Sequence, residues 1–228
     1  TGEDTLSLHD ALPICQFPVG ATSARCLAAA DLNGDAALDL VVGGESPNVL
    51  SVLLGFGDGT YAPKADIALG NSPLDVRVVD VNRDGRLDLV VGGVGRAFEV
   101  LLGVGNGTFG ASVSYGLNAT SRRIEVGDLD RDGVLDVVTS GSGSNYVSVW
   151  LGASNGTFPV RRDWTIGNNP SGIVIRDINA DGIPDLLAAS IGENKITVLL
   201  GVGDGTFGSA TSFPTGGQPW DLVGGDWN

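Results

Sequence analysis

Several kinds of residue are scarce in this chain, and each scarcity excludes a class of protein. Of 228 residues only 13 are lysine or arginine, against 27 aspartate or glutamate, so the formal net charge is −14. Nucleic-acid binding needs a basic face, and this charge balance therefore argues against a nucleic-acid partner. The sequence has no run of roughly 18 or more apolar residues, so it predicts no membrane span.

Histidine is almost absent, which limits the catalytic chemistry available. His9 is the only histidine, so the rest of the chain cannot build a Ser/His/Asp or Cys/His nucleophilic site. Glu99, Glu125 and Glu193 are isolated acids that we expect to face solvent. We therefore expect no catalysis by the chain itself.

Methionine is also absent, and the first residues match nothing else in the chain. They lack the basic start and apolar core of a signal peptide. We interpret residues 1–15 as a leader outside the fold and residues 16–228 as a repeat-built segment. Without a start methionine, and with an end inside a repeat, the sequence predicts a fragment of a longer protein. Cys15 and Cys26 allow a disulfide but do not require one.

Aspartate and glycine are abundant, and the aspartates recur in a fixed pattern. Four nine-residue loops carry Asp or Asn at positions 1, 3, 5 and 9, with glycine or alanine at position 6. They occupy residues 31–39, 80–88, 128–136 and 177–185, at spacings of 49, 48 and 49 residues. A fifth copy begins at Asp226. Such regularity indicates that the acids have a local task beyond solubility.

Oxygen-rich loops of this kind are suited to a hard cation. Carboxylates this close together repel one another unless a cation lies among them, and Ca²⁺ takes six to eight oxygen ligands at about 2.3–2.6 Å. We therefore expect about one Ca²⁺ per complete repeat, held by the side chains at positions 1, 3, 5 and 9. These are Asp31, Asn33, Asp35 and Asp39; Asp80, Asn82, Asp84 and Asp88; Asp128, Asp130, Asp132 and Asp136; and Asp177, Asn179, Asp181 and Asp185.

The loops admit two other interpretations. An EF-hand needs glutamate at position 12 between helices, whereas position 12 here is Val42, Val91, Thr139 or Ala188 and the flanks read as strands. Alternatively, the loops are self-capping Asp/Asn turns without any metal. That reading suits one copy better than four copies in register.

The segments between the loops predict strands. In the second repeat, short β-branched or apolar runs cover residues 74–81, 87–91, 98–102 and 109–115. Asn106-Gly107 predicts a hairpin, because both residues tolerate positive φ. Four short strands in a unit of about 45–50 residues are typical of a propeller blade.

The sequence therefore predicts an all-β propeller segment with four complete blades. The first strand of each blade should line a central channel and the fourth should lie at the rim. Residues 219–225 should open a fifth blade. We expect the parent ring to have seven blades, with six or eight as alternatives.

The aspartate loop, followed by V-x-V-L-L-G-x-G-D-G-T-F, resembles the FG-GAP or VCBS-type repeat over nearly all of residues 16–228. Similar repeats build the N-terminal propeller of integrin α subunits and many secreted bacterial proteins. The resemblance thus implies an extracellular or cell-surface location, in a bacterium. It also implies that the backbone carbonyl at position 7 joins the metal ligands. Position 7 is occupied by Ala37, Arg86, Val134 and Ile183.

One departure from the family pattern concerns the first loop, in which Ala36 stands at position 6. If that position needs positive φ, alanine strains the turn by roughly 1 kcal/mol. We therefore expect the first site to be the weakest.

The resemblance further places the connections from fourth to first strands on the face opposite the calcium loops. They include residues 71–73, 118–120, 168–170 and 218–220, which are rich in Asn, Ser and Pro and include Trp220. We expect a calcium-stabilised binding or adhesion scaffold with a protein or carbohydrate ligand there. Alternatives are a lectin-like carbohydrate-binding propeller and part of a propeller-type polysaccharide lyase. Ordinary turn formation would also account for these residues.

Overall fold

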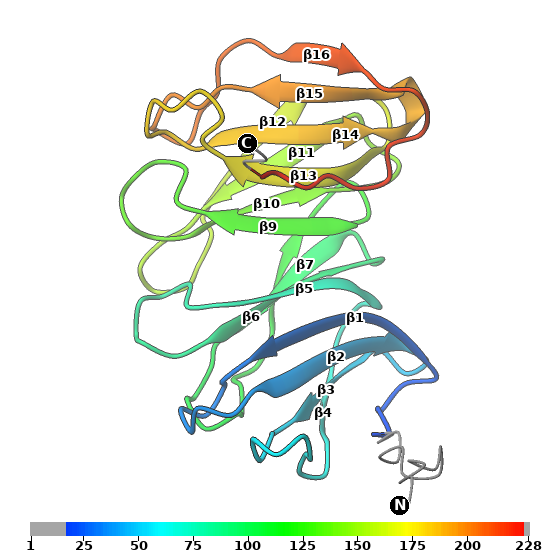
Figure 1. Cartoon of the computed structure of the whole chain (residues 1–228), viewed down its shortest axis with the longest axis vertical. Helices are drawn as coiled ribbons and strands as arrows, with labels where there is room; N and C mark the ends of the chain where they lie inside the picture. The colour runs from blue at the N-terminus through cyan, green and yellow to red at the C-terminus, as the bar shows by residue number, and fades with distance from the viewer. Residues whose placement is uncertain (1–16, 226–228) are drawn as a thin grey trace, which may run out of the picture.

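The computed structural model describes residues 17–225, which form four antiparallel sheets of four strands each (Figure 1). Within each sheet the strands neighbour one another in chain order. The sixteen strands are β1 (Ser23–Ala30), β2 (Asp39–Glu45), β3 (Val49–Leu53), β4 (Ala65–Ala68), β5 (Pro73–Val79), β6 (Asp88–Gly93), β7 (Ala97–Leu101), β8 (Val113–Gly116), β9 (Arg123–Gly127), β10 (Asp136–Ser140), β11 (Tyr146–Leu151), β12 (Val160–Thr165), β13 (Pro170–Arg176), β14 (Asp185–Ser190), β15 (Lys195–Leu199) and β16 (Thr211–Pro214). A 3-10 turn, η2 (Ile191–Glu193), follows β14. The leader and Asp226 lie outside the described residues, and so does the question of a Cys15–Cys26 bridge.

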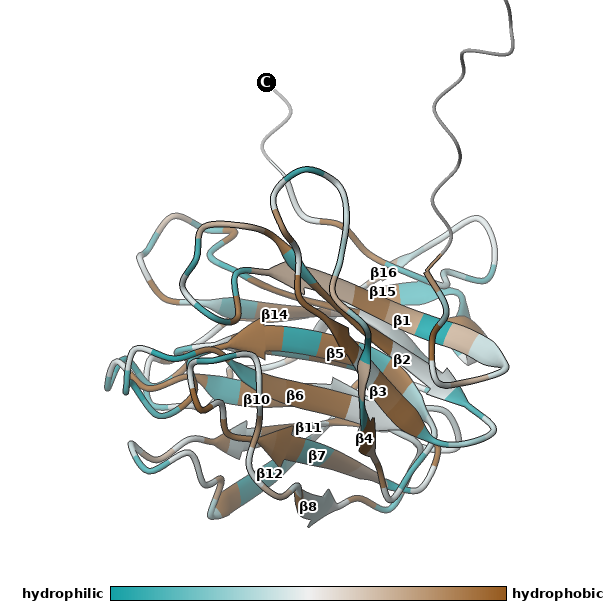
Figure 2. Cartoon of the chain, turned by 90° about the horizontal axis from the view of Figure 1, so that it is seen from below, coloured by the Kyte–Doolittle hydropathy of each residue, from teal (hydrophilic) through white to brown (hydrophobic). Residues whose placement is uncertain are grey.

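The alternation of side chains along the middle strands creates a core on each side of a sheet. In β6, Leu89 and Val91 pack against the first sheet, whereas Val90 packs against the third. Successive strand residues point to opposite faces, so one short apolar run serves two interfaces. Each of the three contacts between neighbouring sheets has its own hydrophobic cluster. In the view of Figure 2 the strands accordingly carry most of the hydrophobic colour and the loops most of the hydrophilic colour.

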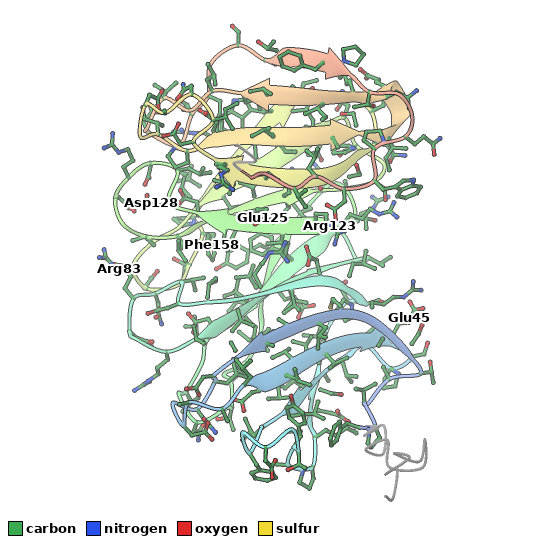
Figure 3. The ribbon with its side chains drawn as sticks, viewed as in Figure 1. Glu45, Arg83, Arg123, Glu125, Asp128 and Phe158 are labelled. Atoms are coloured by element: carbon green, nitrogen blue, oxygen red, sulfur yellow. The ribbon has the colours of Figure 1, made fainter. Side chains whose placement is uncertain are left out.

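Aromatic side chains concentrate at the contact between the second and third sheets. Phe98 is fully buried, stacks on Tyr115 at 4.9 Å between ring centroids, and meets Phe158 edge-on at 5.9 Å. Such edge-to-face pairs add to the stabilisation from area burial. Phe158 lies between these two sheets in Figure 3.

The sheets are arranged as neighbouring propeller blades. The first strands β1, β5, β9 and β13 lie side by side in sequence order (Figure 1). The fourth strands β4, β8, β12 and β16 are mostly exposed. This confirms the predicted inner and outer strands and the all-β blade architecture. The number of blades in a closed ring stays a prediction.

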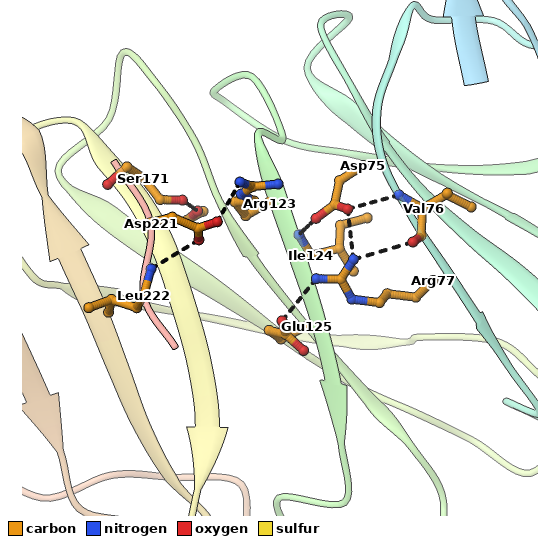
Figure 4. A network of polar contacts seen from close by, with 10 residues as sticks. Asp75, Val76, Arg77, Arg123, Ile124, Glu125, Ser171, Asp221 and Leu222 are labelled. Atoms are coloured by element: carbon orange, nitrogen blue, oxygen red, sulfur yellow. Dashed lines mark hydrogen bonds and ion pairs between the residues drawn. The ribbon is translucent and has the colours of Figure 1, made fainter. Parts of the chain in front are cut away.

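Polar contacts join the inner strands across blades (Figure 4). The Asp75 carboxylate of β5 is buried and accepts a hydrogen bond from the Ile124 N–H of β9 at 3.0 Å. Arg77 donates to Asp75 at 2.7 Å and to Glu125 of β9 at 2.9 Å. Because both oxygens of Asp75 accept hydrogen bonds, these contacts offset the cost of desolvating its buried carboxylate.

Two details of the sequence prediction are wrong. The fourth strand of the second blade was expected at 109–115 but begins at Val113, and Phe109 forms only an isolated bridge with Gly103. The predicted hairpin at Asn106-Gly107 is confirmed, since β7 and β8 on either side of it pair antiparallel, and Val104 N–H donates to Thr108 O at 2.9 Å within the turn. Its residues with positive φ are Gly105 and Gly107, not Asn106.

The segment 219–225 is not a strand, although it was predicted to open a fifth blade. It nevertheless lies along β13, where Ser171 Oγ donates to Pro219 O and Arg176 Nη1 donates to Gly224 O, both at 2.6 Å. Gly172 permits this approach, because a Cβ there would lie 2.6 Å from the Leu222 nitrogen. Among the described residues, no strand forms β-sheet backbone hydrogen bonds with this segment. It is therefore not a β-strand.

In the described part of the chain, no helix has the length and hydrophobicity that a membrane span requires.

Candidate metal centres

Each aspartate loop connects the first strand of a blade to the second, so all four emerge from the same end of their strands. In Figure 3, Asp128 and Arg83 of two loops lie at one end of the strands, and Arg123 and Glu45 lie at the other. The fold therefore separates a face with the acidic loops from an opposite face.

The carboxylate at position 1 accepts the N–H of position 6 in all four loops, including Gly133 to Asp128 at 2.9 Å, and in three of them it also accepts the N–H of position 4. In the second loop, Asp80 Oδ1 accepts the Arg83 N–H at 2.6 Å and Oδ2 accepts the Gly85 N–H at 2.9 Å. Asp31 and Asp177 accept the corresponding N–H groups at 2.7 and 2.8 Å. These backbone hydrogen bonds, that from position 6 foremost, hold the pKa values of Asp31 and Asp177 below the usual range. Both acids are therefore anionic at neutral pH.

The carboxylate at position 9 has a second task, which the sequence reading missed. Asp88 is fully buried; its Oδ2 accepts the Val81 N–H at 2.9 Å and its Oδ1 accepts the Gly103 N–H at 2.6 Å. Gly103 opens the turn between the third and fourth strands. Asp39, Asp136 and Asp185 make the same pair of bonds in their blades. Position 9 thus ties the aspartate loop to the glycine-rich turn, which explains why the two motifs occur together.

The amide at position 3 closes three of the loops internally. Asn33, Asn82 and Asn179 each donate from Nδ2 to the carboxylate at position 5, at 2.9, 3.1 and 2.8 Å. The amide supplies a donor where two carboxylates would repel. In these loops the carboxylate at position 5 therefore has a hydrogen-bond donor within the loop.

The third loop differs, because position 3 is Asp130. Asp128, Asp130 and Asp136 bring one carboxylate oxygen each to within 4.8 Å of one another. Within residues 17–225 no other set of three His, Cys, Asp or Glu side chains meets this distance. Asp132, at position 5, is outside the group, and its Oδ1 accepts the Val134 N–H at 2.7 Å.

The electrostatics of the third loop fit a cation. Asp128 Oδ1 is buried and has no hydrogen-bond partner among the described residues. Burial raises the pKa of Asp130, and the charges of Asp132 and Asp128 add to the effect. Burial also raises the pKa of Asp136 to about 6, against the opposing hydrogen bonds from Gly152 and Leu129. Clustered acids with an orphaned oxygen are what a divalent ion would stabilise, so this group can hold a metal.

The backbone of the loops also departs from expectation. Position 6 has positive φ in every copy, 68° at Ala36 and 80–83° at the three glycines. Position 4 has positive φ as well, at 62–64° in Arg83, Arg131 and Ala180. Only the first loop has glycine there, Gly34 at 79°. Each loop therefore contains one left-handed glycine and one left-handed non-glycine residue, and Ala36 alone gives no reason for a weaker first site.

In the described part of the chain, two larger cavities open on the face opposite the loops. One, of about 620 Å³, is lined by Asn118, Asn168 and Asn169 from the predicted connections. The other, of about 460 Å³, is lined by residues from all four blades together with Trp220. The predicted binding face is thus hollowed, and polar side chains line part of both cavities.

The three isolated glutamates are not simply solvated. Glu99 is 3% exposed and accepts the Asn71 backbone and side-chain N–H groups, both at 3.2 Å. Glu125 pairs with Arg77, and Glu193 pairs with Lys195 at 2.6 Å. The expectation that these acids face solvent was wrong for Glu99, whereas Glu193 is exposed and Glu125 is half-buried, although both are paired.

A comparison with protein families decides the affiliation. The FG-GAP-like repeat matches four times, at residues 31–91, 80–139, 128–188 and 177–228. The chain belongs to the FG-GAP-like repeat family. Each match begins at the first aspartate of a loop, so the FG-GAP-like repeats coincide with the loops described above. No curated protein matches the chain.

Solved structures support the fold of these FG-GAP-like repeats. One is a lectin from Agrocybe aegerita, described as recognising non-reducing terminal N-acetylglucosamine; it is 24% identical, has a TM-score of 0.55, and the match covers 81% of this chain and 50% of the lectin. Another is BBS1N in complex with ARL6DN, 15% identical with a TM-score of 0.62, covering 88% of this chain and 60% of that one. At these identities the likeness concerns the fold alone. The chain spans half to three fifths of the length of these structures.

Proposed function

We propose that this chain is a calcium-stabilised extracellular scaffold that binds a protein or glycan ligand on the face opposite its aspartate loops, without catalysis of its own. The observation that carries the calcium proposal is the cluster of Asp128, Asp130 and Asp136, with its buried unpaired oxygen. The other three loops offer the same positions 1, 5 and 9 with an amide oxygen at position 3, which suits the oxygen preference of Ca²⁺.

The loop residues would do two things in this scheme. Positions 1, 3 and 5 present oxygens on a turn already shaped by backbone hydrogen bonds, and position 9 links that turn to the next strand pair. A bound Ca²⁺ would supply the positive charge that these carboxylates lack. Position 7 would offer its backbone carbonyl, as proposed for Ala37, Arg86, Val134 and Ile183.

Calcium removal tests this proposal. At free calcium about 100 times the Kd, each site adds roughly 2.7 kcal/mol to the free energy of unfolding. We expect EDTA to lower the melting temperature by many degrees and calcium, added in excess, to restore it. Magnesium, which demands a tighter octahedral shell, is the matched control and should restore much less. A melting curve that is identical with and without EDTA would refute the calcium role.

Carbohydrate is the ligand class we place first. The Asn-lined cavity offers amide donors and acceptors suited to sugar hydroxyls, and the similar Agrocybe aegerita protein is a lectin. A glycan array probed with the calcium-loaded chain, with and without EDTA, tests this. Binding restricted to protein partners would favour the adhesion form of the proposal, and cleavage of a bound polysaccharide would contradict the absence of catalysis.

A further inference from the structure

The second cavity of the binding face is formed by one repeated position. The cavity measures about 460 Å³, and its wall includes the residue that stands six places before the first aspartate of each repeat. In chain order these equivalent residues are Arg25, Leu74, Arg122, Ser171 and Trp220. In the four complete blades the position lies at or directly before the start of the inner strand, and Trp220 lies in the segment that runs along β13, so all five residues meet at the same opening.

The residue type at this cavity position differs from repeat to repeat, whereas the first and last aspartates of the loops are constant. The first and last aspartates are the same residue in all four complete loops, because every blade needs the same turn. The cavity position instead changes between guanidinium, alkyl, hydroxyl and indole side chains. Equivalent positions that carry different chemistry around one cavity form an asymmetric site, which is suited to one orientation of a ligand.

The cavity is basic within an acidic protein. Arg25, Arg122 and Arg123 line it, against the single acid Asp221, whereas the whole chain has a net charge of −14. Arg25 pairs with Glu45, and Arg123 pairs with Asp221 at 2.7 Å. Each guanidinium has five N–H donors, so one carboxylate partner leaves others free.

Arg122 is the least neutralised of the three. Among the described residues, no carboxylate oxygen lies within 4.0 Å of its guanidinium nitrogens. Its guanidinium instead lies over the Trp220 ring, 5.1 Å from the centroid. Trp220 is 58% exposed. The arrangement therefore leaves the ring face of Trp220 away from Arg122 for a ligand, beside a guanidinium that has no carboxylate partner among the described residues.

We propose that this cavity binds an anionic saccharide. A sugar ring packs its C–H face on the side of the Trp220 indole that Arg122 does not cover, while Arg122, with Arg25, receives the carboxylate or sulfate of the sugar. The hydroxyls of Thr120 and Ser142, which also line the cavity, are placed to bond ring hydroxyls. An acidic peptide is disfavoured because the opening is a compact hollow and not a sheet edge or long groove. This inference rests on the proposed glycan-binding function and gives it a site and a ligand class.

Calorimetric titration of the whole chain in millimolar calcium tests the proposal. The probes are trigalacturonate, a chondroitin sulfate tetrasaccharide, the neutral methyl ester of trigalacturonate, and a short poly-glutamate peptide. We expect at least one of the two acidic saccharides to bind. Comparing the affinity for trigalacturonate with that for the chondroitin sulfate tetrasaccharide then shows whether the cavity prefers a carboxylate or a sulfate. The neutral ester should bind at least tenfold more weakly, since it loses the charge-assisted bonds.

Variants locate the binding. Arg122→Gln and Trp220→Ala should each weaken binding of the preferred probe by about tenfold or more. Arg162→Gln is the matched control, because Arg162 lies on the outer strand β12 and donates to Asp204 O at 3.4 Å; it should change affinity by less than about twofold. Melting curves with calcium should show all three variants folded.

Three results would overturn the proposal: no binding of either acidic saccharide, equal binding of the neutral ester, or unchanged affinity in Arg122→Gln. Binding of poly-glutamate alone would also overturn it in favour of an acidic peptide. These failures are distinct from failure of the broader function. If the chain binds other glycans and EDTA still lowers its stability, the proposed function as a glycan-binding scaffold stands. Only the proposal that this cavity binds an anionic saccharide then fails.

Discussion

The third aspartate loop differs from the other three in how it accommodates closely spaced carboxylates. In the first, second and fourth loops an asparagine at position 3 donates to the carboxylate at position 5. In the third loop Asp130 replaces that donor with a charge, and Asp128 Oδ1 stays buried without a partner among the described residues. The group at position 3, amide or carboxylate, thus separates three loops that close with an internal hydrogen bond from one loop whose clustered acids could hold a metal ion.

The largest expected effect tests what all four loops share. Asp136→Ala removes the acceptor of two N–H groups, those of Leu129 and Gly152. An unpaired buried donor costs about 1–3 kcal/mol, so we expect a loss of about 3 kcal/mol or more in the free energy of unfolding. The measurement is urea unfolding in EDTA, where calcium ligation plays no part.

The control for this variant is Asp132→Ala, in the same loop. Asp132 accepts the Val134 N–H, which is part-buried, so the loss should be near 1 kcal/mol. Asp88→Ala should cost as much as Asp136→Ala, since position 9 makes the same bonds in both loops. Equal losses for Asp132→Ala and Asp136→Ala would contradict the bridging role of position 9.

A change of sign is expected for Asp130→Asn. In EDTA it removes a like charge and restores an amide donor, so stability should rise by about 1 kcal/mol. In calcium it removes one ligand charge, so affinity for the ion should fall by about tenfold. Differential scanning calorimetry and a calcium titration measure the two effects.

The reverse exchange completes the comparison. Asn82→Asp, in the second loop, should lower stability in EDTA and strengthen calcium binding. Asp130→Asn and Asn82→Asp should therefore change the stability in EDTA in opposite directions. If both variants raise it, or both lower it, position 3 does not divide the loops as described.

The smallest expected effect concerns the first loop. Ala36→Gly should raise the free energy of unfolding by about 1 kcal/mol, because position 6 has a φ of 68° and alanine is strained there. Gly34→Ala, its matched partner at φ 79°, should lower stability by a similar amount. Urea unfolding resolves both; a destabilised Ala36→Gly would show that flexibility of the unfolded chain outweighs the strain.

The sequence predicted what depends on local spacing. The register of the aspartates, the four-strand unit and the inner and outer strands followed from periods along the chain, and the structure confirms them. The positive φ at Ala36 was also anticipated, because the other copies have glycine there. The left-handed residues Arg83, Arg131 and Ala180 were not, since neither arginine nor alanine indicates positive φ.

What the sequence did not predict depends on contacts between distant segments. The bond from Gly103 to Asp88 spans 15 residues, and only the constant co-occurrence of the two motifs hinted at it. The shortened fourth strand depends on how Gly105 and Gly107 shape the turn. The basic cavity needs the blades in place, because Arg25 and Arg122 are far apart in the chain.

One small contact has a consequence for how such a molecule grows. Gly107, Gly156 and Gly205 each sit against a leucine of the preceding blade, where a Cβ would come within 2.5–2.8 Å of Leu54, Leu102 or Leu151. The same glycine–leucine contact thus joins each adjacent pair of the four described blades. A duplicated unit of about 49 residues would bring its own glycine to contact the leucine of the blade before it. It would also bring its own leucine to contact the glycine of the blade after it. Gene duplication could therefore lengthen the array by one blade without redesigning any existing junction.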